Sequence, residues 1–194
     1  MKQLLFVTHN AHKSEEVKSI VANNFEIINL SDINFFEEIP ETGNTFKENA
    51  LQKAKYLHDK LGCNCFADDT GLEVEALNGE PGVYSARYAG EPSNSQRNIE
   101  KLLKNLNGKE NRKAQFTTVI AVILNNETYF FEGAISGQII ECQRGEGGFG
   151  YDSIFIPDGY DKTFAELPDE VKNSISHRAV AMQKFKDFIN TITE

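Results

Sequence analysis

The segment from Thr45 to Gly62 constrains the fold most, because it carries the full set of signals for an amphipathic helix. Thr45 and Glu48 have the spacing of a capping box, and Gly62 is the residue type that most often ends a helix. Apolar residues recur at helical spacing on one face, at Phe46, Ala50, Ala54, Leu57 and Leu61. We therefore predict a helix from Thr45 to Gly62 with one face in a core.

Short apolar segments alternate with such helical patterns along the rest of the chain. Strands are predicted over Lys2–Thr8, Phe25–Leu30 and Cys63–Ala67, and a hairpin over Gln115–Leu124 and Thr128–Ile140 around Asn125 and Asn126. Further helices are predicted around Val17, Ile20 and Val21, over Ser93–Asn107, and from about Ser176 through Ala181, Phe185, Phe188 and Ile192. Interleaved helices with local and non-local strand pairing predict a mixed α/β sheet.

The size and composition of the chain suit a single domain over residues 1–194. Of its residues 40% are hydrophobic, and no linker rich in Pro, Gly or Ser divides it. Apolar runs such as Val119–Leu124 are far shorter than the roughly 20 residues needed to cross a bilayer. The N-terminal segment also lacks the long apolar region and cleavage site of a signal peptide. We expect no membrane span.

Charge and cysteine content narrow the partners and the compartment. The 20 basic and 29 acidic side chains give a net charge of -9, which disfavours binding to a long nucleic-acid backbone. A small anionic ligand would need a few converging cations or a metal ion held by carboxylates. The three cysteines, Cys63, Cys65 and Cys142, form no CxxC pair, which argues against a disulfide framework or zinc ribbon and favours a reducing cytoplasm.

The segment THNAHK, residues 8 to 13, lies where a predicted strand turns into a helix. Unpaired N–H groups at a helix start gather phosphate oxygens, together with the Thr8 hydroxyl and the Lys13 ammonium. The segment is also consistent with an ordinary helix start, capped by Asn10 and with Lys13 in solvent. His9 and His12 are weak candidates for a transition-metal site, because such sites usually need three or four ligands of this kind.

An acidic set is the second candidate site: Glu41, Asp68, Asp69 and Glu73. Carboxylate oxygens suit Mg²⁺, and a carboxylate beside a metal can take a proton from an attacking water. Adjacent side chains of an extended strand point to opposite sides, so Asp68 and Asp69 are expected to do different things. The alternative is that ADDTG forms a turn after a short strand, since Asp and Gly favour turns.

Two further segments carry residue types that recognise a nucleotide base. Glycines surround Phe149 in RGEGGFGYD, residues 144 to 152, so its ring either faces a base or drops into the core from a hairpin connection. His177 and Arg178 in KNSISHR, residues 172 to 178, stand at the predicted start of the last helix. There they either read ligand oxygens or form a cap with solvated charges.

Taken in order, six segments resemble the inosine triphosphate pyrophosphatase family, also called dITP/XTP pyrophosphatases: THNAHK, ETGNTFKENALQKA, FADDTGLEVEAL, PGVYSARYAG, GGFGYD and SHR. The resemblance spans nearly the whole chain. It implies an elongated mixed α/β sheet with flanking helices, two lobes that enclose a nucleotide cleft, and a homodimer. It also implies Mg²⁺-dependent hydrolysis of ITP, dITP and XTP to the monophosphate and pyrophosphate.

The resemblance further implies the site residues. Asp69 matches the catalytic proton acceptor, and Glu41 and Asp69 match the Mg²⁺ ligands. Positions that bind substrate in the family are matched by Thr8, His9, Asn10, Ala11, His12, Lys13, Lys53, Thr70, Phe149, Gly150, Tyr151, Asp152, Lys172, His177 and Arg178. Two positions depart from the pattern: His9 stands where a small or amide-bearing residue is common, and Thr70 stands where serine is frequent.

Two alternatives to this function stay open at the level of sequence. A related pyrophosphatase that acts on pyrimidine or modified nucleotides would share the phosphate machinery. A nucleotide-binding sensor would bind the same ligands without turnover. The acidic set together with the phosphate loop argues against the sensor.

Overall fold

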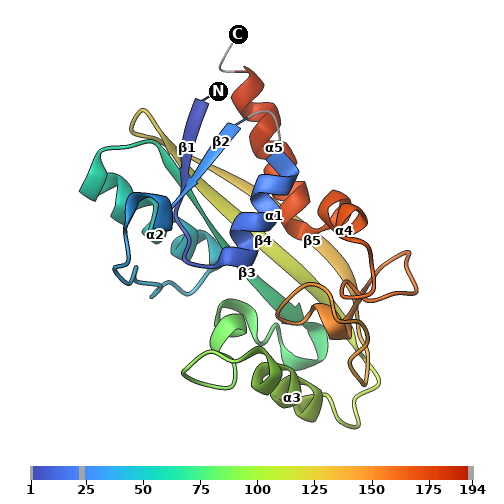
Figure 1. The fold of residues 1–194 in the computed structure, drawn as a ribbon. Coiled ribbons are helices and arrows are strands. Elements are labelled where there is room, and N and C mark those ends of the chain that lie inside the picture. Colours follow the sequence, from blue (N-terminus) through green and yellow to red (C-terminus); the bar gives the residue numbers. More distant parts are fainter. Residues whose placement is uncertain (1, 22–24, 192–194) are drawn as a thin grey trace. The chain divides into compact units, whose positions relative to one another are not determined.

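The computed structural model of the protein describes residues 2–21 and 25–191. The strands are β1 (Lys2–Phe6), β2 (Phe25–Asn29), β3 (Cys65–Val74), β4 (Lys113–Leu124), β5 (Glu127–Ile139) and β6 (Phe155–Pro157). The α-helices are α1 (Ala11–Val21), α2 (Phe46–Leu61), α3 (Ser95–Asn105), α4 (Asp169–Ile175) and α5 (His177–Thr191) (Figure 1). Short 3₁₀ helices are η1 (Ser31–Ile33), η2 (Glu75–Leu77), η3 (Gly82–Arg87) and η4 (Asp152–Ile154).

The strands form one six-stranded sheet in the order β2-β1-β3-β4-β5-β6. Strand β1 pairs in parallel with β2 and with β3, whereas β5 pairs antiparallel with β6. Between β4 and β5 the chain turns through Asn125 and Asn126, whose φ angles of 50° and 68° are typical of a two-residue hairpin turn. The predicted hairpin and the predicted mixed α/β class are both confirmed.

The chain forms two compact units, each built from separate segments. Unit 1 comprises Met1–Asp69, Thr118–Gly133 and Arg178–Glu194, and unit 2 comprises Thr70–Thr117 and Ala134–His177. The chain passes from one unit to the other within β3, β4 and β5, and again at the start of α5. A single domain over residues 1–194 stays a prediction.

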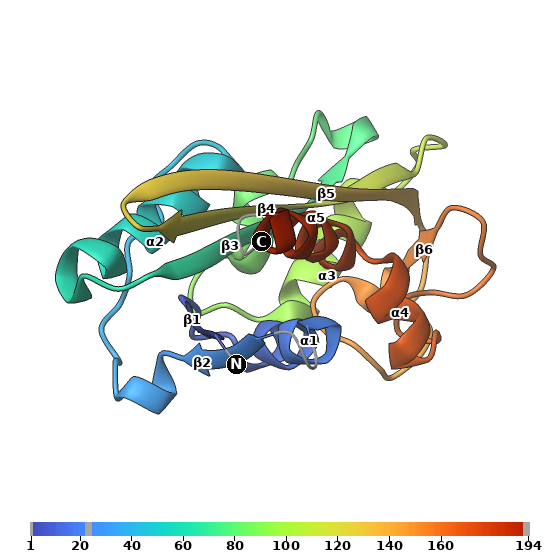
Figure 2. The ribbon, with the colours of Figure 1, turned by 90° about the horizontal axis from the view of Figure 1, so that it is seen from above.

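In unit 1, helices pack on both faces of the sheet. Successive residues of β1 therefore belong to different hydrophobic clusters. Leu4 and Phe6 pack with residues of α1 and α5, and Leu5 packs with residues of α2. Figure 1 shows α1 and α5 side by side, and Figure 2 shows α5 lying along β4 and β5, whose Ile120 and Val122 join the same cluster as α5. These packed helices fix the positions of the polar residues that follow β1.

In unit 2, helix α3 supplies one side of a separate core. Its buried Ile99 and Leu102 pack in a cluster with Leu72 of β3 and with aromatic rings from β4, β6 and the loop after β6. Those rings are Phe116, Phe155 and Phe164, and Phe116 contacts Phe155 edge-on at 4.8 Å between centroids. Aromatic pairs of this geometry add to the stabilisation from burial.

The predicted helix Thr45–Gly62 is confirmed, with one exception on its apolar face. The Thr45 side chain accepts a hydrogen bond from the Glu48 N–H at 3.1 Å, and Gly62 ends α2 with a φ of 64°. The Glu48 carboxylate accepts from the N–H of Asn44 at 2.7 Å, one residue before the cap. Leu61 is 47% exposed, so its predicted burial is wrong; it lies in the last turn of the helix.

The predicted strand Cys63–Ala67 and the alternative of an ADDTG turn are both corrected by β3. This strand runs from Cys65 to Val74, so Asp68, Asp69 and Thr70 lie inside it, not at its end. Turn propensity is overridden here because both aspartates are buried and bonded to side chains from other elements. Because Asp68 and Asp69 are consecutive residues inside a strand, their carboxylates point to opposite sides of the sheet, as predicted.

The C-terminal part of the chain contains more elements than the sequence predicts. The last helix, α5, starts at His177, close to the predicted Ser176. Ser176 has an extended ψ of 157°, and this residue separates α5 from α4. Helix α4, strand β6 and the 3₁₀ helix η4 are not among the predicted elements, and neither are η1 to η3 earlier in the chain. Ile192, predicted to pack on the last helix, lies outside the described residues.

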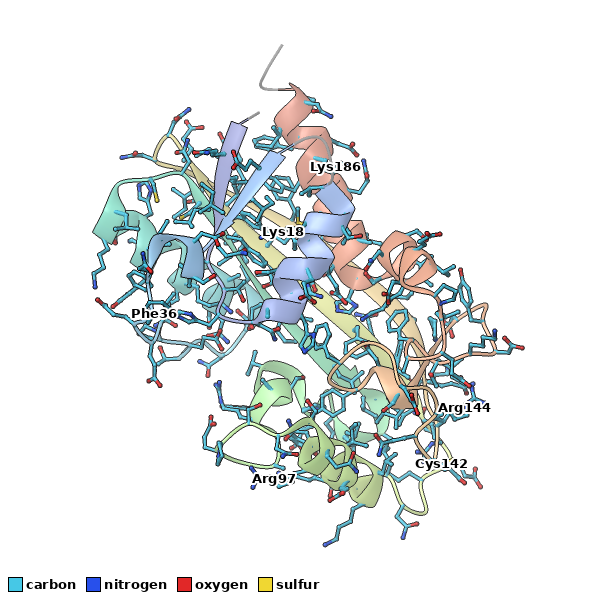
Figure 3. All side chains as sticks on the ribbon, in the orientation of Figure 1. Lys18, Phe36, Arg97, Cys142, Arg144 and Lys186 are labelled. Carbon is cyan, nitrogen blue, oxygen red and sulfur yellow. The ribbon has the colours of Figure 1, made fainter. Side chains whose placement is uncertain are left out.

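Several surface features bear on the sequence expectations. All three cysteines are free, and Cys142 is exposed (Figure 3). Burial raises the pKa of Cys65 to about 12, so this thiol is inert.

Figure 3 also labels Phe36, which is 73% exposed on the loop before α2. None of the helices in the described part of the chain combines the length and apolar character needed to cross a membrane.

Candidate active site

The segment from Thr8 to Lys13 forms a capped helix start, as one of the two sequence interpretations requires. The Thr8 hydroxyl accepts from the Asn10 N–H at 3.1 Å, and the Asn10 side chain accepts from the Lys13 N–H at 3.2 Å. Residues 9 to 12 are exposed. The Lys13 side chain, however, is not in solvent: it is 15% exposed, and its ammonium donates to Asp68 at 3.0 Å. The interpretation as a capped helix start is therefore confirmed for the backbone, but its expectation that the Lys13 ammonium lies in solvent is wrong.

His9 and His12 occupy the exposed part of this segment. The Nε2 atom of His9 lies 2.9 Å from the carbonyl oxygen of Glu37, which ties the segment to the acidic loop before α2. Within residues 2–21 and 25–191, no three histidine, cysteine or carboxylate side chains are grouped so that they could hold a metal ion. A transition-metal site at the two histidines is not supported by this geometry.

Asp68 is the centre of a buried charge network in unit 1. It is 2% exposed and accepts hydrogen bonds from Lys13 and from Nε and Nη2 of Arg178, at 3.2 and 3.1 Å. The Arg178 Nη1 atom also donates to Glu16 on α1. Burial by itself would raise the pKa of Asp68, but Lys13 and Arg178 outweigh it and hold that pKa well below its usual range. Asp68 is therefore an anion that fixes two cations.

Asp69 faces a different set of partners, as the alternation along a strand predicts. Its Oδ2 atom accepts from the Asn49 side chain at 3.0 Å, and its Oδ1 atom lies 3.5 Å from the Lys53 ammonium. Burial raises the pKa of Asp69, although the nearby Lys53 and Lys13 oppose the shift. A carboxylate with a raised pKa, held by two side chains, has the character of a proton acceptor.

Lys53 joins Asp69 to the second predicted metal ligand. Its ammonium donates to Glu41 in the loop before α2, and it is 9% exposed. Burial opposes the charged form of Lys53, yet Asp69 and Glu41 together raise its pKa. Two carboxylates that converge on one cation form a set of hard oxygen donors, and Mg²⁺ commonly takes one or two carboxylates and completes its shell with water and phosphate oxygens. The donor set at Glu41 and Asp69 fits Mg²⁺.

Unit 2 carries a second cluster, centred on Asp152. The carboxylate of Asp152 accepts from the Phe149 N–H at 2.8 Å and from the Lys172 ammonium at 2.6 Å, and Asp152 and Lys172 are each 4% exposed. The Lys172 ammonium also lies 5.0 Å from the centre of the Phe149 ring. Phe149 is only partly buried and does not belong to the core cluster of unit 2. The interpretation that its ring drops into the core is wrong.

The other predicted base-binding residues are largely buried. Tyr151 is 5% exposed, and its hydroxyl donates to the Ser85 carbonyl oxygen at 2.9 Å; burial raises the pKa of this hydroxyl. The His177 ring stacks on Phe116 with 4.8 Å between centroids and is 4% exposed. The interpretation of KNSISHR as a cap with solvated charges is therefore wrong for His177, Arg178 and Lys172. By contrast, Gly150 of the predicted base-binding segment and Thr70, a predicted substrate contact, are partly exposed; both belong to unit 2.

Three residues that organise these clusters are absent from the sequence prediction. Asn49 holds Asp69, Glu16 holds Arg178, and the Ser85 carbonyl holds Tyr151. A signal exists for Asn49, because it precedes Lys53 by one helical turn and so shares its face of α2. Glu16 has a similar relation to Lys13, three residues earlier on α1. Ser85 acts through its backbone, which no residue pattern reveals.

The mixed sheet with its flanking helices defines an α/β protein, and each of its two units holds a buried cluster of carboxylates and cations. The model of the Ham1 family matches residues 4–188 of this chain. The chain belongs to the Ham1 family.

Individual relatives are similar over nearly their full length. A dITP/XTP pyrophosphatase of Flavobacterium johnsoniae is 52% identical over 187 residues, which are 96% of this chain and 97% of the relative. A dITP/XTP pyrophosphatase of Bacillus subtilis is 48% identical over 193 residues, 97% of this chain and 98% of the relative. The structure of the Staphylococcus aureus Ham1 protein matches with a TM-score of 0.88 and 42% identity, covering 98% of this chain and 99% of that one.

Proposed function

We propose that this protein hydrolyses the purine nucleoside triphosphates ITP, dITP and XTP to the monophosphate and pyrophosphate. Relatives about half identical over nearly the whole chain carry the name dITP/XTP pyrophosphatase. The structural observation that carries the proposal is the pairing of carboxylates with buried lysine ammonium groups in unit 1. There Lys13 is bonded to Asp68, and Lys53 is bonded to Glu41 and lies beside Asp69.

In the proposed reaction, Asp69 orients a water and accepts its proton as the oxygen attacks the α-phosphorus. Its raised pKa suits this role, because a stronger base takes the proton more readily near neutral pH. Lys13 and Lys53 stabilise the negative charge that builds up on the phosphate oxygens and on the departing pyrophosphate. The N–H groups at the start of α1 bind the phosphate chain further from the bond that breaks.

We also propose that the enzyme depends on Mg²⁺ held by Glu41 and Asp69. When bound, the ion supplies a positive charge that neutralises phosphate oxygens and lowers the pKa of water. The expected result of removing divalent metal with EDTA is loss of pyrophosphate release, restored when Mg²⁺ is added in excess. Turnover that persists in EDTA would contradict the dependence, and a circular-dichroism spectrum with and without EDTA checks that the fold is intact.

We assign the base to the cluster in unit 2. The partly exposed Phe149 offers a ring face for stacking, and Lys172 and His177 provide donors for a 6-oxo group. Adenine has a 6-amino group, which would leave such donors unpaired and so be rejected strongly. This rationale supports a preference for ITP over ATP.

The decisive experiment compares ITP, dITP, XTP and ATP as substrates with Mg²⁺ and identifies the released phosphate. Pyrophosphate is expected from ITP at least about 100-fold faster than from ATP, judged by kcat/KM. Equal rates, or release of orthophosphate, would overturn the proposal. Pyrimidine and modified nucleotides in the same panel distinguish a related pyrophosphatase, and binding of ITP without any release would identify a sensor.

Two glycines of unit 2 allow a matched pair of variants. A Cβ atom on Gly148 would lie 2.2 Å from Oδ2 of Asp152, whereas a Cβ atom on Gly159 meets nothing within 4 Å; the φ angles are 69° and 85°. Gly148→Ala should therefore displace Asp152 and raise KM for ITP at least tenfold, about 1.4 kcal/mol. Gly159→Ala carries a similar backbone strain of about 1–2 kcal/mol at a position outside the predicted site and serves as the control. Equal KM values in the two variants would count against this assignment.

Two further properties belong to this proposal. The resemblance to the family supports a homodimer, and a molar mass near that of one chain in light scattering would exclude it. The free cysteines, with the buried Cys65 thiol among them, support a reducing cytoplasmic setting.

A further inference from the structure

Asn49 is fully buried on α2 and uses both ends of its side-chain amide. Its Oδ1 atom accepts from the Gly43 N–H at 2.7 Å, and its Nδ2 atom donates to Oδ2 of Asp69 at 3.0 Å. A backbone N–H can only donate, and an ionised carboxylate can only accept. One orientation of the amide therefore satisfies both partners, which fixes the Asn49 side chain without ambiguity.

The two partners of Asn49 belong to the two segments that carry the proposed metal ligands. Gly43 follows Glu41 by two residues in the loop before α2, and Asp69 lies in β3. Asn49 is thus the side chain that ties the Glu41 loop to the Asp69 carboxylate. Lys53, four residues later on the same helix face, contacts Glu41 and lies beside Asp69.

The backbone at Gly43 shows how close this contact is. A Cβ atom at that position would lie 2.6 Å from the Glu48 Cβ atom and 2.9 Å from Asn49 Oδ1. Only glycine lets the loop approach α2 closely enough for the 2.7 Å hydrogen bond. The loop and the amide therefore fit each other at a fixed separation.

The hydrogen bond from Asn49 also determines which carboxylate oxygen of Asp69 is available to accept a proton from water. Because Oδ2 is held by the amide, Oδ1 is the oxygen that faces the ammonium of Lys53. Without the amide, the carboxylate could rotate about its terminal torsion, which has a broad energy minimum. A reacting carboxylate displaced in this way loses rate without losing substrate affinity.

We propose that Asn49 is a positioning residue for the hydrolysis, because its amide sets the orientation of Asp69 and the position of the loop that carries Glu41. This inference rests on the proposed function. Within residues 2–21 and 25–191, the side-chain amide of Asn49 bonds Gly43 and Asp69, neither of which is among the predicted substrate-binding residues.

The test uses Asn49→Ser, which shortens the side chain, and Asn49→Leu, which keeps a side chain of similar size without a donor or an acceptor. In both variants kcat for ITP is expected to fall by about 10–100-fold, as for other residues that orient a metal-binding side chain. KM, and the affinity for a non-hydrolysable ITP analogue measured by calorimetry, should change by less than about threefold, because uniform binding is retained.

Asn98 offers a matched control in unit 2. It is a buried asparagine on α3 whose amide bonds the backbone of Ser85, Ala86 and Ala89, at 2.7 to 3.3 Å. Asn98→Ser should lower Tm by an amount similar to that of Asn49→Ser while kcat stays within about twofold of the unsubstituted enzyme. If the two serine variants lose kcat equally, or if KM for the Asn49 variants rises as much as kcat falls, Asn49 has only a structural role and the proposal is overturned.

Crystal structures of the enzyme and of Asn49→Ser separate this proposal from the proposed function. A rotated Asp69 carboxylate or a shifted Glu41 loop is expected in the variant. An unchanged site would overturn the positioning role whatever the substrate is. Failure of the unsubstituted enzyme to hydrolyse ITP would instead reject the proposed function, and the positioning role would then be decided by the two structures.

Discussion

Replacing Asp69 with asparagine is expected to reduce pyrophosphate release from ITP by on the order of 10²–10⁴, the usual contribution of a positioned general base. The amide has nearly the same shape and still offers an oxygen to the Asn49 side chain, but it cannot accept a proton at neutral pH. Steady-state kinetics with a pyrophosphate-specific assay gives the measurement.

The stability of the Asp69→Asn variant provides the control. Burial disfavours the ionised form of Asp69, but its charge also stabilises the buried ammonium of Lys53, so the neutral amide should lower Tm moderately while the bond from Lys53 to Glu41 keeps the variant folded. Affinity for a non-hydrolysable ITP analogue should be retained. Activity near that of the unsubstituted enzyme would show that another group takes the proton.

Replacing Arg178 with methionine is expected to lower the free energy of unfolding by about 3–5 kcal/mol, the usual cost of removing one partner of a buried ion pair. Arg178 is 1% exposed and bonds two carboxylates, those of Asp68 and Glu16. In the variant both carboxylates lose their guanidinium, while Asp68 keeps its bond to the ammonium of Lys13. Chemical denaturation at neutral pH measures the loss.

Two companion variants sharpen the test of Arg178. Adding Asp68→Asn to Arg178→Met removes the buried charge and should recover part of the lost stability, a coupling that a double-mutant cycle detects. Lys60→Met breaks an exposed ion pair with Glu37, whose side chains are 43% and 54% exposed, and should cost at most about 1 kcal/mol. A loss for Arg178→Met as small as that for Lys60→Met would contradict the role given to the buried network.

Local signals in the sequence were sufficient for the elements whose stability is local. Helix α2 has its cap at Thr45 and its left-handed glycine at Gly62, and the hairpin turns at Asn125 and Asn126, all within a few residues of the patterns that predict them. Helix α4 and strand β6 escaped prediction because they are short, seven and three residues long. Such elements depend on tertiary packing more than on their own periodicity.

The acidic pair shows why the site was only partly predictable. Residue types pointed to Lys13, Glu41 and the acidic pair, and strand alternation indicated that Asp68 and Asp69 would face different sides. The family resemblance added Lys53 and singled out Asp69. The turn alternative was attractive because Asp and Gly favour turns, and it was wrong because partners up to 110 residues away satisfy the two carboxylates inside a strand. Partners at such separations leave no local pattern, which is also why the contact between Glu16 and Arg178 was not predicted.

The discontinuity of unit 1 has a consequence for the order in which the protein is completed on the ribosome. Arg178, the guanidinium partner of Asp68, lies in the last segment of unit 1, and the whole of unit 2 precedes that segment in the chain. Although domains at the N-terminus generally fold first during synthesis, the first unit here lacks a buried cation and helix α5 until the segment that begins at Arg178 has been translated. Unit 2, begun second, is therefore the first to have all of its residues, and a nascent chain stalled before residue 178 would carry the phosphate loop without the arginine that balances Asp68.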